Sequence, residues 1–170
     1  EDSGLIAELG AYVLREVCRQ VAAWDAAGLP PFRVAVNVSA VEMKSERFVE
    51  RLRAVLAETG VDARRLELEL TESALAPAAD TEDGHDVLAR LNALRDLGLH
   101  LAVDDFGTGY SCLRYLKTYP IDRLKIDQSF VRGLPGDDND VAISQAVIAL
   151  GRSLHMEVVA EGVETVAQAG

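Results

Sequence analysis

The sequence of 170 residues lacks the features that mark several protein classes. It has no run of about 18 consecutive apolar residues, the length that a membrane-spanning helix needs, and it shows no secretory signal peptide. Its two cysteines, Cys18 and Cys112, make a disulfide framework unexpected and fit a reducing, cytoplasmic compartment. The formal net charge of −11 argues against a surface that binds a nucleic acid polymer.

The remaining composition is that of an ordinary globular domain. Hydrophobic residues make up 49% of the chain and charged residues 26%, and the length suffices for one sizeable core. The chain begins with Glu rather than Met and ends where a helix starts. We therefore expect residues 1–170 to be a single domain taken from a longer protein and truncated at both ends.

Strand-like and helix-like segments alternate along the chain. Apolar runs predict five strands, and helical spacing of apolar residues predicts helices between them. The expected strands are 32–38, 66–71, 99–104, 121–127 and 158–160; the expected helices are 5–27, 45–60, 87–97, 113–117 and 141–154, with a last helix starting at Thr165. Such a series is typical of a parallel sheet with right-handed crossovers.

Two α/β architectures share this alternation. A doubly wound sheet usually carries a glycine-rich phosphate loop after its first strand, whereas Asn37 to Ala40 follow here without a glycine. A (β/α) barrel typically needs about 250 residues, so five strands would be most of such a barrel with its ends missing. Ser39 to Glu42 also have the pattern of a helix-starting capping box.

The most informative segment is the pair Asp104-Asp105, which ends an apolar strand and precedes the glycine-containing loop 106–111. Neighbouring carboxylates repel each other in a low-dielectric site, so their joint ionisation implies a compensating cation. A lone Asp-Asp pair is more often a solvated turn, and the metal hypothesis gains because other strand ends are polar too. Gly107 and Gly109 are expected in a flexible lid or a turn with positive φ rather than in a phosphate cradle.

Polar residues also occupy the ends of the other strands. Asn37 ends the first strand, Glu67 and Glu69 share one face of the second, Lys125 lies in the fourth, and Glu161 follows the fifth. The alternatives are a wet strand face for the two glutamates and a satisfied ion pair for the lysine. In a barrel all of these residues converge on one rim. Oxygen ligands suit Mg²⁺ or Mn²⁺, and a carboxylate shared by two ions would allow phosphodiester hydrolysis.

The residues and their order resemble one family, the EAL domains, which are bacterial cyclic di-GMP phosphodiesterases. The resemblance covers the whole chain, and the combination of Asp-Asp-Phe-Gly-Thr-Gly-Tyr-Ser with Ala-Glu-Gly-Val-Glu is its most specific part. The matching segments are 4–6, 36–40, 68–73, 104–111, 124–127, 129–131 and 160–165.

The resemblance implies a TIM-like barrel, incomplete here, that hydrolyses cyclic di-GMP to linear pGpG. It implies that Asn37, Glu69, Asp104 and Asp105 bind two Mg²⁺ or Mn²⁺ ions, with Asp104 bridging them and Ca²⁺ inhibiting. It implies two catalytic residues: Lys125, which positions or helps to deprotonate the attacking water, and Glu161, a second-shell or general-base carboxylate. Glu72 would anchor the loop, with Asp127 and Glu164 in the second shell; the loop and lid residues are Phe106, Gly107, Thr108, Gly109, Tyr110 and Ser111.

The resemblance also implies partners, and two features of the family are absent from this sequence. We expect a homodimer that uses the loop, joined to sensory or GGDEF-type domains in a parent protein that a membrane anchor could hold. The eponymous Glu-Ala-Leu motif, whose Glu is a metal ligand, and the last barrel strand are absent from the 170 residues, so the isolated chain is expected to be inactive. The alternative function is a catalytically silent EAL module that acts as a cyclic di-GMP receptor or a protein-interaction domain.

Overall fold

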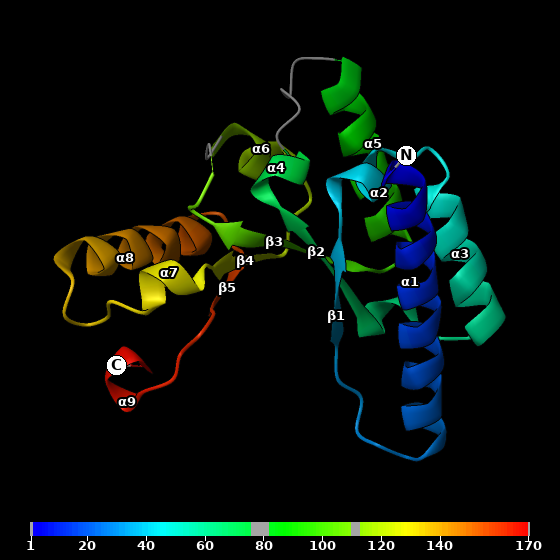
Figure 1. Ribbon diagram of the computed structural model, residues 1–170, viewed down its shortest axis with the longest axis horizontal. Coiled ribbons are helices and arrows are strands. Elements are labelled where there is room, and N and C mark those ends of the chain that lie inside the picture. Colours follow the sequence, from blue (N-terminus) through cyan, green and yellow to red (C-terminus); the bar gives the residue numbers. More distant parts are fainter. Residues whose placement is uncertain (1, 76–81, 110–112, 170) are drawn as a thin grey trace.

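The computed structural model describes residues 2–75, 82–109 and 113–169. Within them, five parallel strands form one sheet whose spatial order, β1-β2-β3-β4-β5, is the order of the chain (Figure 1). A doubly wound sheet reverses direction at a switch point, whereas a barrel adds each strand beside the previous one. The strand order therefore shows a TIM-barrel-like α/β sheet that is not closed, and this decides between the two architectures. The strands are β1 (Val34–Val38), β2 (Leu66–Thr71), β3 (His100–Phe106), β4 (Arg123–Ile126) and β5 (Glu157–Ala160).

Helices flank the sheet along its length. α1 and α3 contact each other beside β1, and α8 packs on β4 and β5 near the other edge (Figure 1). The helices are α1 (Asp2–Ala26), α2 (Ala40–Lys44), α3 (Phe48–Thr59), α4 (Glu72–Leu75), α5 (Glu82–Asp96), α6 (Leu113–Thr118), α7 (Gln128–Val131), α8 (Asp138–Ser153) and α9 (Val166–Ala169), with a 3₁₀ turn at Ala63–Arg65. None of the helices in the described ranges combines the length and the apolar character that a membrane crossing requires.

Strand β2 shows how the sequence pattern builds the sheet. Leu66, Leu68 and Leu70 point to one face and are fully buried in the main apolar core. Glu67 and Glu69 point to the opposite face, as the alternation predicts. That face is not solvated, because the two glutamates are only 1% and 7% exposed. Both acids are therefore buried on that face and need cationic partners there.

Local signals explain most differences between the expected and observed elements. The capping box is confirmed: Glu42 N donates to Ser39 Oγ at 3.2 Å, and Ser39 N donates to Glu42 Oε2 at 3.0 Å. It starts α2 at Ala40, a separate short helix that precedes α3, and α3 is the helix expected over 45–60. Strand β3 continues two residues beyond its expected end at Asp104. The four-residue helices α4 and α7 were not expected, because one turn is too short for a helical period.

Candidate metal centre

Lys125 lies at the centre of a carboxylate cluster at the C-terminal ends of the strands. Its Nζ contacts Glu69 Oε1 at 2.7 Å, Asp104 Oδ1 at 2.8 Å and Glu161 Oε1 at 2.6 Å. These side chains come from β2, β3 and the turn after β5, and Lys125 itself comes from β4. The structure thus brings together four residues that the sequence placed separately at strand ends.

Sheet register explains why these side chains meet. Asn37 pairs with Glu69 across β1 and β2, so both point to the same face of the sheet. Asn37 is exposed at the β1 edge, and its side-chain amide has no hydrogen-bond partner within the described ranges. Its oxygen is therefore available to a ligand beside Glu69.

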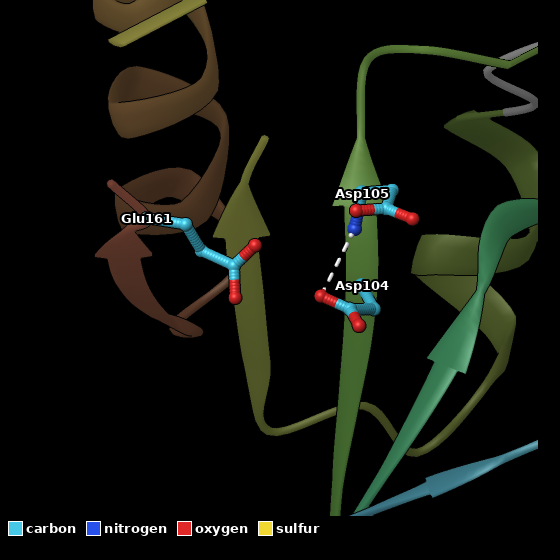
Figure 2. Close-up of side chains that lie close together, drawn as sticks. All are labelled: Asp104, Asp105 and Glu161. Carbon is cyan, nitrogen blue, oxygen red and sulfur yellow. Dashed lines mark hydrogen bonds between the residues drawn. The ribbon is translucent and has the colours of Figure 1, made fainter. Parts of the chain in front are cut away.

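A β-bulge brings both aspartates to the same site. Val103 pairs with Leu124 and Phe106 with Ile126, so Asp104 and Asp105 together lie opposite one residue. In a regular strand, neighbouring side chains point to opposite faces, and a bulge changes the direction of the second one. Asp105 adopts a left-handed backbone conformation, with φ of 51°. As a result, ligand oxygens of Asp104, Asp105 and Glu161 lie within 4.8 Å of one another (Figure 2).

The electrostatics of Asp105 show an excess of negative charge. Burial raises the pKa of Asp105, and the charges of Asp104, Asp127 and Glu161 raise it further. The side chains of Asp105 and Asp127 share a hydrogen bond. The pKa of Asp127 is lowered, first by hydrogen bonds from Ser129 and then by the one from Asp105. Asp105 is therefore the carboxyl of the cluster whose ionised form is disfavoured by burial and by its acidic neighbours.

Lys125 brings one positive charge to this cluster of several carboxylates. Burial alone would lower the pKa of Lys125, but hydrogen bonds to Asp104, Glu161 and Glu69 raise it above its usual value. The ammonium group is therefore charged at neutral pH and acts as a hydrogen-bond donor rather than a proton acceptor.

The donor set fits a hard divalent cation. Its members are carboxylate and amide oxygens, and Mg²⁺ or Ca²⁺ oxygens lie about 2.0–2.6 Å from the ion. Three carboxylates within 4.8 Å of one another can share an ion at such distances. The negative charge around Asp105 also favours binding of a cation there.

A buried glutamate holds the loop that follows Asp105. Glu72 is 4% exposed and accepts hydrogen bonds from Gly107 N at 3.2 Å and Gly109 N at 3.0 Å. A Cβ atom on Gly109 would lie 2.6 Å from Glu72 Oε2, so a side chain there would displace the carboxylate. Gly107 has φ of +102°, which fits the expected turn with positive φ. Thr108 Oγ1 donates to Asp105 O at 2.9 Å and closes that turn.

The other expected loop and second-shell residues have different environments. Phe106 is the last residue of β3 and is buried in the main core, so it holds the base of the loop and does not cover the site. Tyr110 and Ser111 lie outside the described residues. Asp127 reaches Asp105, whereas the exposed Glu164 uses its backbone N to bond Gln168 Oε1 at 2.9 Å. In the part of the chain that the structure describes, the Glu164 side chain is not brought to the cluster.

Glu67 has a different function from Glu69, although the two share a strand face. Its oxygens contact Arg33 Nη1 at 3.2 Å and Arg123 Nη1 at 2.6 Å. These arginines lie 34 and 56 residues away, so no local signal could separate the two glutamates. Glu67 is neutralised at the opposite end of the strands and is not a ligand candidate. The sequence analysis also did not anticipate the bulge at Asp104-Asp105.

Comparison with known proteins agrees with this geometry. All residues, 1–170, match the family model described as EAL domain. The bifunctional diguanylate cyclase/cyclic di-GMP phosphodiesterase MucR of Pseudomonas aeruginosa is 42% identical over 168 residues, which are 99% of this chain and 24% of that protein. The chain spans about a fifth to a quarter of the length of the curated relatives it matches.

Solved structures show the same likeness in three dimensions. The PaMucR phosphodiesterase in complex with c-di-GMP superposes with a TM-score of 0.90 at 42% identity, over 99% of this chain and 66% of that chain. Klebsiella pneumoniae BlrP1, in a complex with manganese and cyclic di-GMP, superposes with a TM-score of 0.78 at 28% identity, over 98% of this chain and 40% of that chain.

Proposed function

The chain belongs to the EAL domain family, and we propose that its carboxylate cluster hydrolyses cyclic di-GMP to linear pGpG with divalent cations. The observation that carries the proposal is the convergence of Glu69, Asp104 and Glu161 on Lys125, with Asp105 turned to the same side by the bulge. Relatives named as cyclic di-GMP phosphodiesterases support the choice of substrate.

The metal ligands in this proposal are Asn37, Glu69, Asp104 and Asp105, which would hold two Mg²⁺ or Mn²⁺ ions with Asp104 between them. Their oxygen chemistry and the excess negative charge at Asp105 support this assignment. When bound, such cations would offset the charge of the phosphodiester and make a water more acidic. Ca²⁺ should inhibit, because its larger and looser coordination sphere suits a different geometry.

Two residues of the chain, Lys125 and Glu161, are assigned to the attacking water. Lys125 stays protonated, so we assign it to donating a hydrogen bond to the attacking water and orienting it. Glu161 lies 2.6 Å from the ammonium group and is partly exposed, which makes it the candidate to accept the water's proton. The water oxygen then bonds to phosphorus while the bond to one ribose oxygen breaks, and that oxygen takes up a proton.

The surroundings of the site have supporting roles in the proposal. Asp127 would hold the Asp105 carboxyl and Glu72 would fix the loop, whereas Glu164, whose side chain does not reach the cluster in the described residues, is given no role. We also propose that the loop takes part in a homodimer and that the protein carries sensory or GGDEF-type domains, since MucR is named as bifunctional. A cytoplasmic site of action is part of the proposal, whether or not the parent protein is membrane-anchored.

The test is product analysis with the full-length protein. Incubation with cyclic di-GMP and Mg²⁺ or Mn²⁺ should yield pGpG on ion-exchange chromatography, Ca²⁺ should suppress the product, and Asp104→Asn should remove it. Tight binding of cyclic di-GMP without pGpG would favour the silent-receptor alternative and overturn the proposed hydrolysis.

A further inference from the structure

The short helix α7 contacts both the cluster, through Asp127, and the loop that follows β3, through Phe130. Its N-cap is Asp127, whose Oδ1 accepts a hydrogen bond from Ser129 N at 2.9 Å. The Asp127 carboxyl also shares a hydrogen bond with the side chain of Asp105. The helix follows β4 directly, so Lys125 and α7 are part of one continuous segment. α7 is therefore linked to Lys125 through the chain and to Asp105 through Asp127.

The ring of Phe130, on α7, lies against the loop backbone. A Cβ atom built on Gly107 would lie 2.9 Å from Phe130 Cε2 and 3.4 Å from Cζ, so the ring edge touches the place where a side chain would be. Phe130 is partly buried and packs on the main core. Glu72 holds the same loop by accepting from the Gly107 and Gly109 amides. Gly107 is thus fixed by both a carboxylate and an aromatic ring.

Gly107 is closely coupled to Asp105. Thr108 donates to Asp105 O from both its backbone N, at 3.3 Å, and its hydroxyl, at 2.9 Å, which makes residues 105–108 one hydrogen-bonded turn. Asp105 has the left-handed φ of 51° that side-chain-bearing residues rarely adopt. Such a conformation persists only when its surroundings hold it. A group that fixes Gly107 therefore also fixes the direction of the Asp105 carboxylate.

We propose that Phe130 is a positioning residue that keeps Asp105 directed at the cluster by holding Gly107. The inference rests on the proposed function, because it assigns Phe130 to the metal site of that reaction. Phe130 itself touches neither substrate nor metal in this assignment. The structural consequence of removing the ring can be measured without any turnover.

The first test is amide hydrogen exchange at Gly107 and Gly109 in the metal-free, full-length protein. Phe130→Ala should accelerate exchange at both amides by about tenfold, which corresponds to about 1.4 kcal/mol. Phe130→Leu, which keeps an apolar contact and also serves if the alanine variant fails to fold, should accelerate it less. Leu134→Ala is the matched control, because Leu134 is also a partly buried residue of this region but is not among the nearest neighbours of the loop glycines. Unchanged exchange in both Phe130 variants, or equal acceleration in the control, would overturn the proposal.

The second test is binding of Mn²⁺ alone, followed by calorimetry. Phe130→Ala should weaken Mn²⁺ binding by about tenfold or more, the effect of about 1.4 kcal/mol, while Leu134→Ala leaves it unchanged. At saturating Mn²⁺, the KM for cyclic di-GMP should stay close to wild type. If the wild-type protein bound Mn²⁺ but made no pGpG, the proposed function would fail and both tests of Phe130 would still apply. If pGpG formed normally and Mn²⁺ affinity did not change in Phe130→Ala, the positioning role alone would fall.

Discussion

Crowding of carboxylates affects Lys125 and Asp105 in different ways. Hydrogen bonds to three carboxylates outweigh burial and raise the pKa of Lys125, which fixes it as a cation. Burial and like charge raise the pKa of Asp105, which favours its protonated form. The same cluster thus raises the pKa of an ammonium group through hydrogen bonds and that of a carboxyl through burial and like charge.

Replacement of Lys125 tests its role as an orienting donor. Lys125→Ala should lower the rate of the chemical step by about 10²–10⁴, the range of general acid–base groups, and Glu161→Gln should behave similarly. Mn²⁺ binding and cyclic di-GMP affinity should change little in either variant. Single-turnover kinetics with the full-length protein measure the step, with the exposed Lys117→Ala as control. Loss of cyclic di-GMP binding with an unchanged rate at saturation would make Lys125 a phosphate clamp instead.

The sequence could identify the cluster residues but not all of their surroundings. Glu69, Lys125 and Glu161 were predictable because parallel strands place their C-terminal ends on one rim. The pairing of Glu67 with arginines could not be predicted, because Arg33 and Arg123 are distant from it in sequence. Nor does a pattern of period two reveal that Asp105 faces the same way as Asp104, since this depends on a bulge set by pairing with β4.

At the scale of elements, the bulge in β3 is where function and backbone preference conflict. Asp105 has a conformation that costs an L-residue about 1–2 kcal/mol, whereas glycine in a strand loses about 0.5–1 kcal/mol. Asp105→Gly should therefore leave the unfolding free energy of the metal-free protein within about 1 kcal/mol of wild type. Stabilisation by added Mn²⁺ should nevertheless be lost, as measured by urea denaturation with and without the metal.

Asp104→Gly is the matched comparison. It removes the contact between Asp104 and Lys125 at 2.8 Å and leaves a mostly buried ammonium group with fewer partners. The free energy of unfolding of metal-free Asp104→Gly should therefore be lower than that of metal-free Asp105→Gly. Equal stability of the two variants would show that the left-handed conformation of Asp105 carries no cost.

A second element-scale contact joins β4 and β5 at the other end of the strands. Arg123 Nη2 contacts Glu157 Oε2 at 2.6 Å, and hydrogen bonding and charge from Arg123 lower the pKa of Glu157 from 4.5. A lowered carboxyl pKa contributes stability above the unfolded value, and this contribution disappears as pH falls through the folded value. Glu157→Gln should thus lower Tm at pH 7, and the difference from wild type should shrink as the pH falls below 4.5.

The loss of stability caused by Glu157→Gln should be small. The Glu157 side chain is 65% exposed, so solvent screens the pair and the loss should be about 1 kcal/mol or less. Glu46→Gln is the control, because Glu46 is exposed and has no ion pair among the described residues. Thermal unfolding of both variants is measured from about pH 3 to pH 7, and a Tm deficit of Glu157→Gln that does not shrink at the acid end would contradict the assignment.

At the scale of the whole molecule, the order of the strands is the decisive feature. All five expected strands exist in one parallel sheet, because buried apolar runs and intervening helices are strong local signals. Their spatial order was not readable from the pattern, which left a doubly wound sheet and a barrel open. The order β1 to β5 along the sheet selects the barrel type and places every strand end on one concave rim. Fold and site are therefore consequences of the same topology.

The most direct test of a metal site at this rim is anomalous diffraction from crystals of the full-length protein soaked in Mn²⁺. We predict anomalous density within about 2.0–2.6 Å of the side-chain oxygens of Asp104, Asp105 and Glu69, and its loss in Asp104→Asn. Density at another location, or none at this rim in crystals whose protein converts cyclic di-GMP to pGpG, would contradict the account.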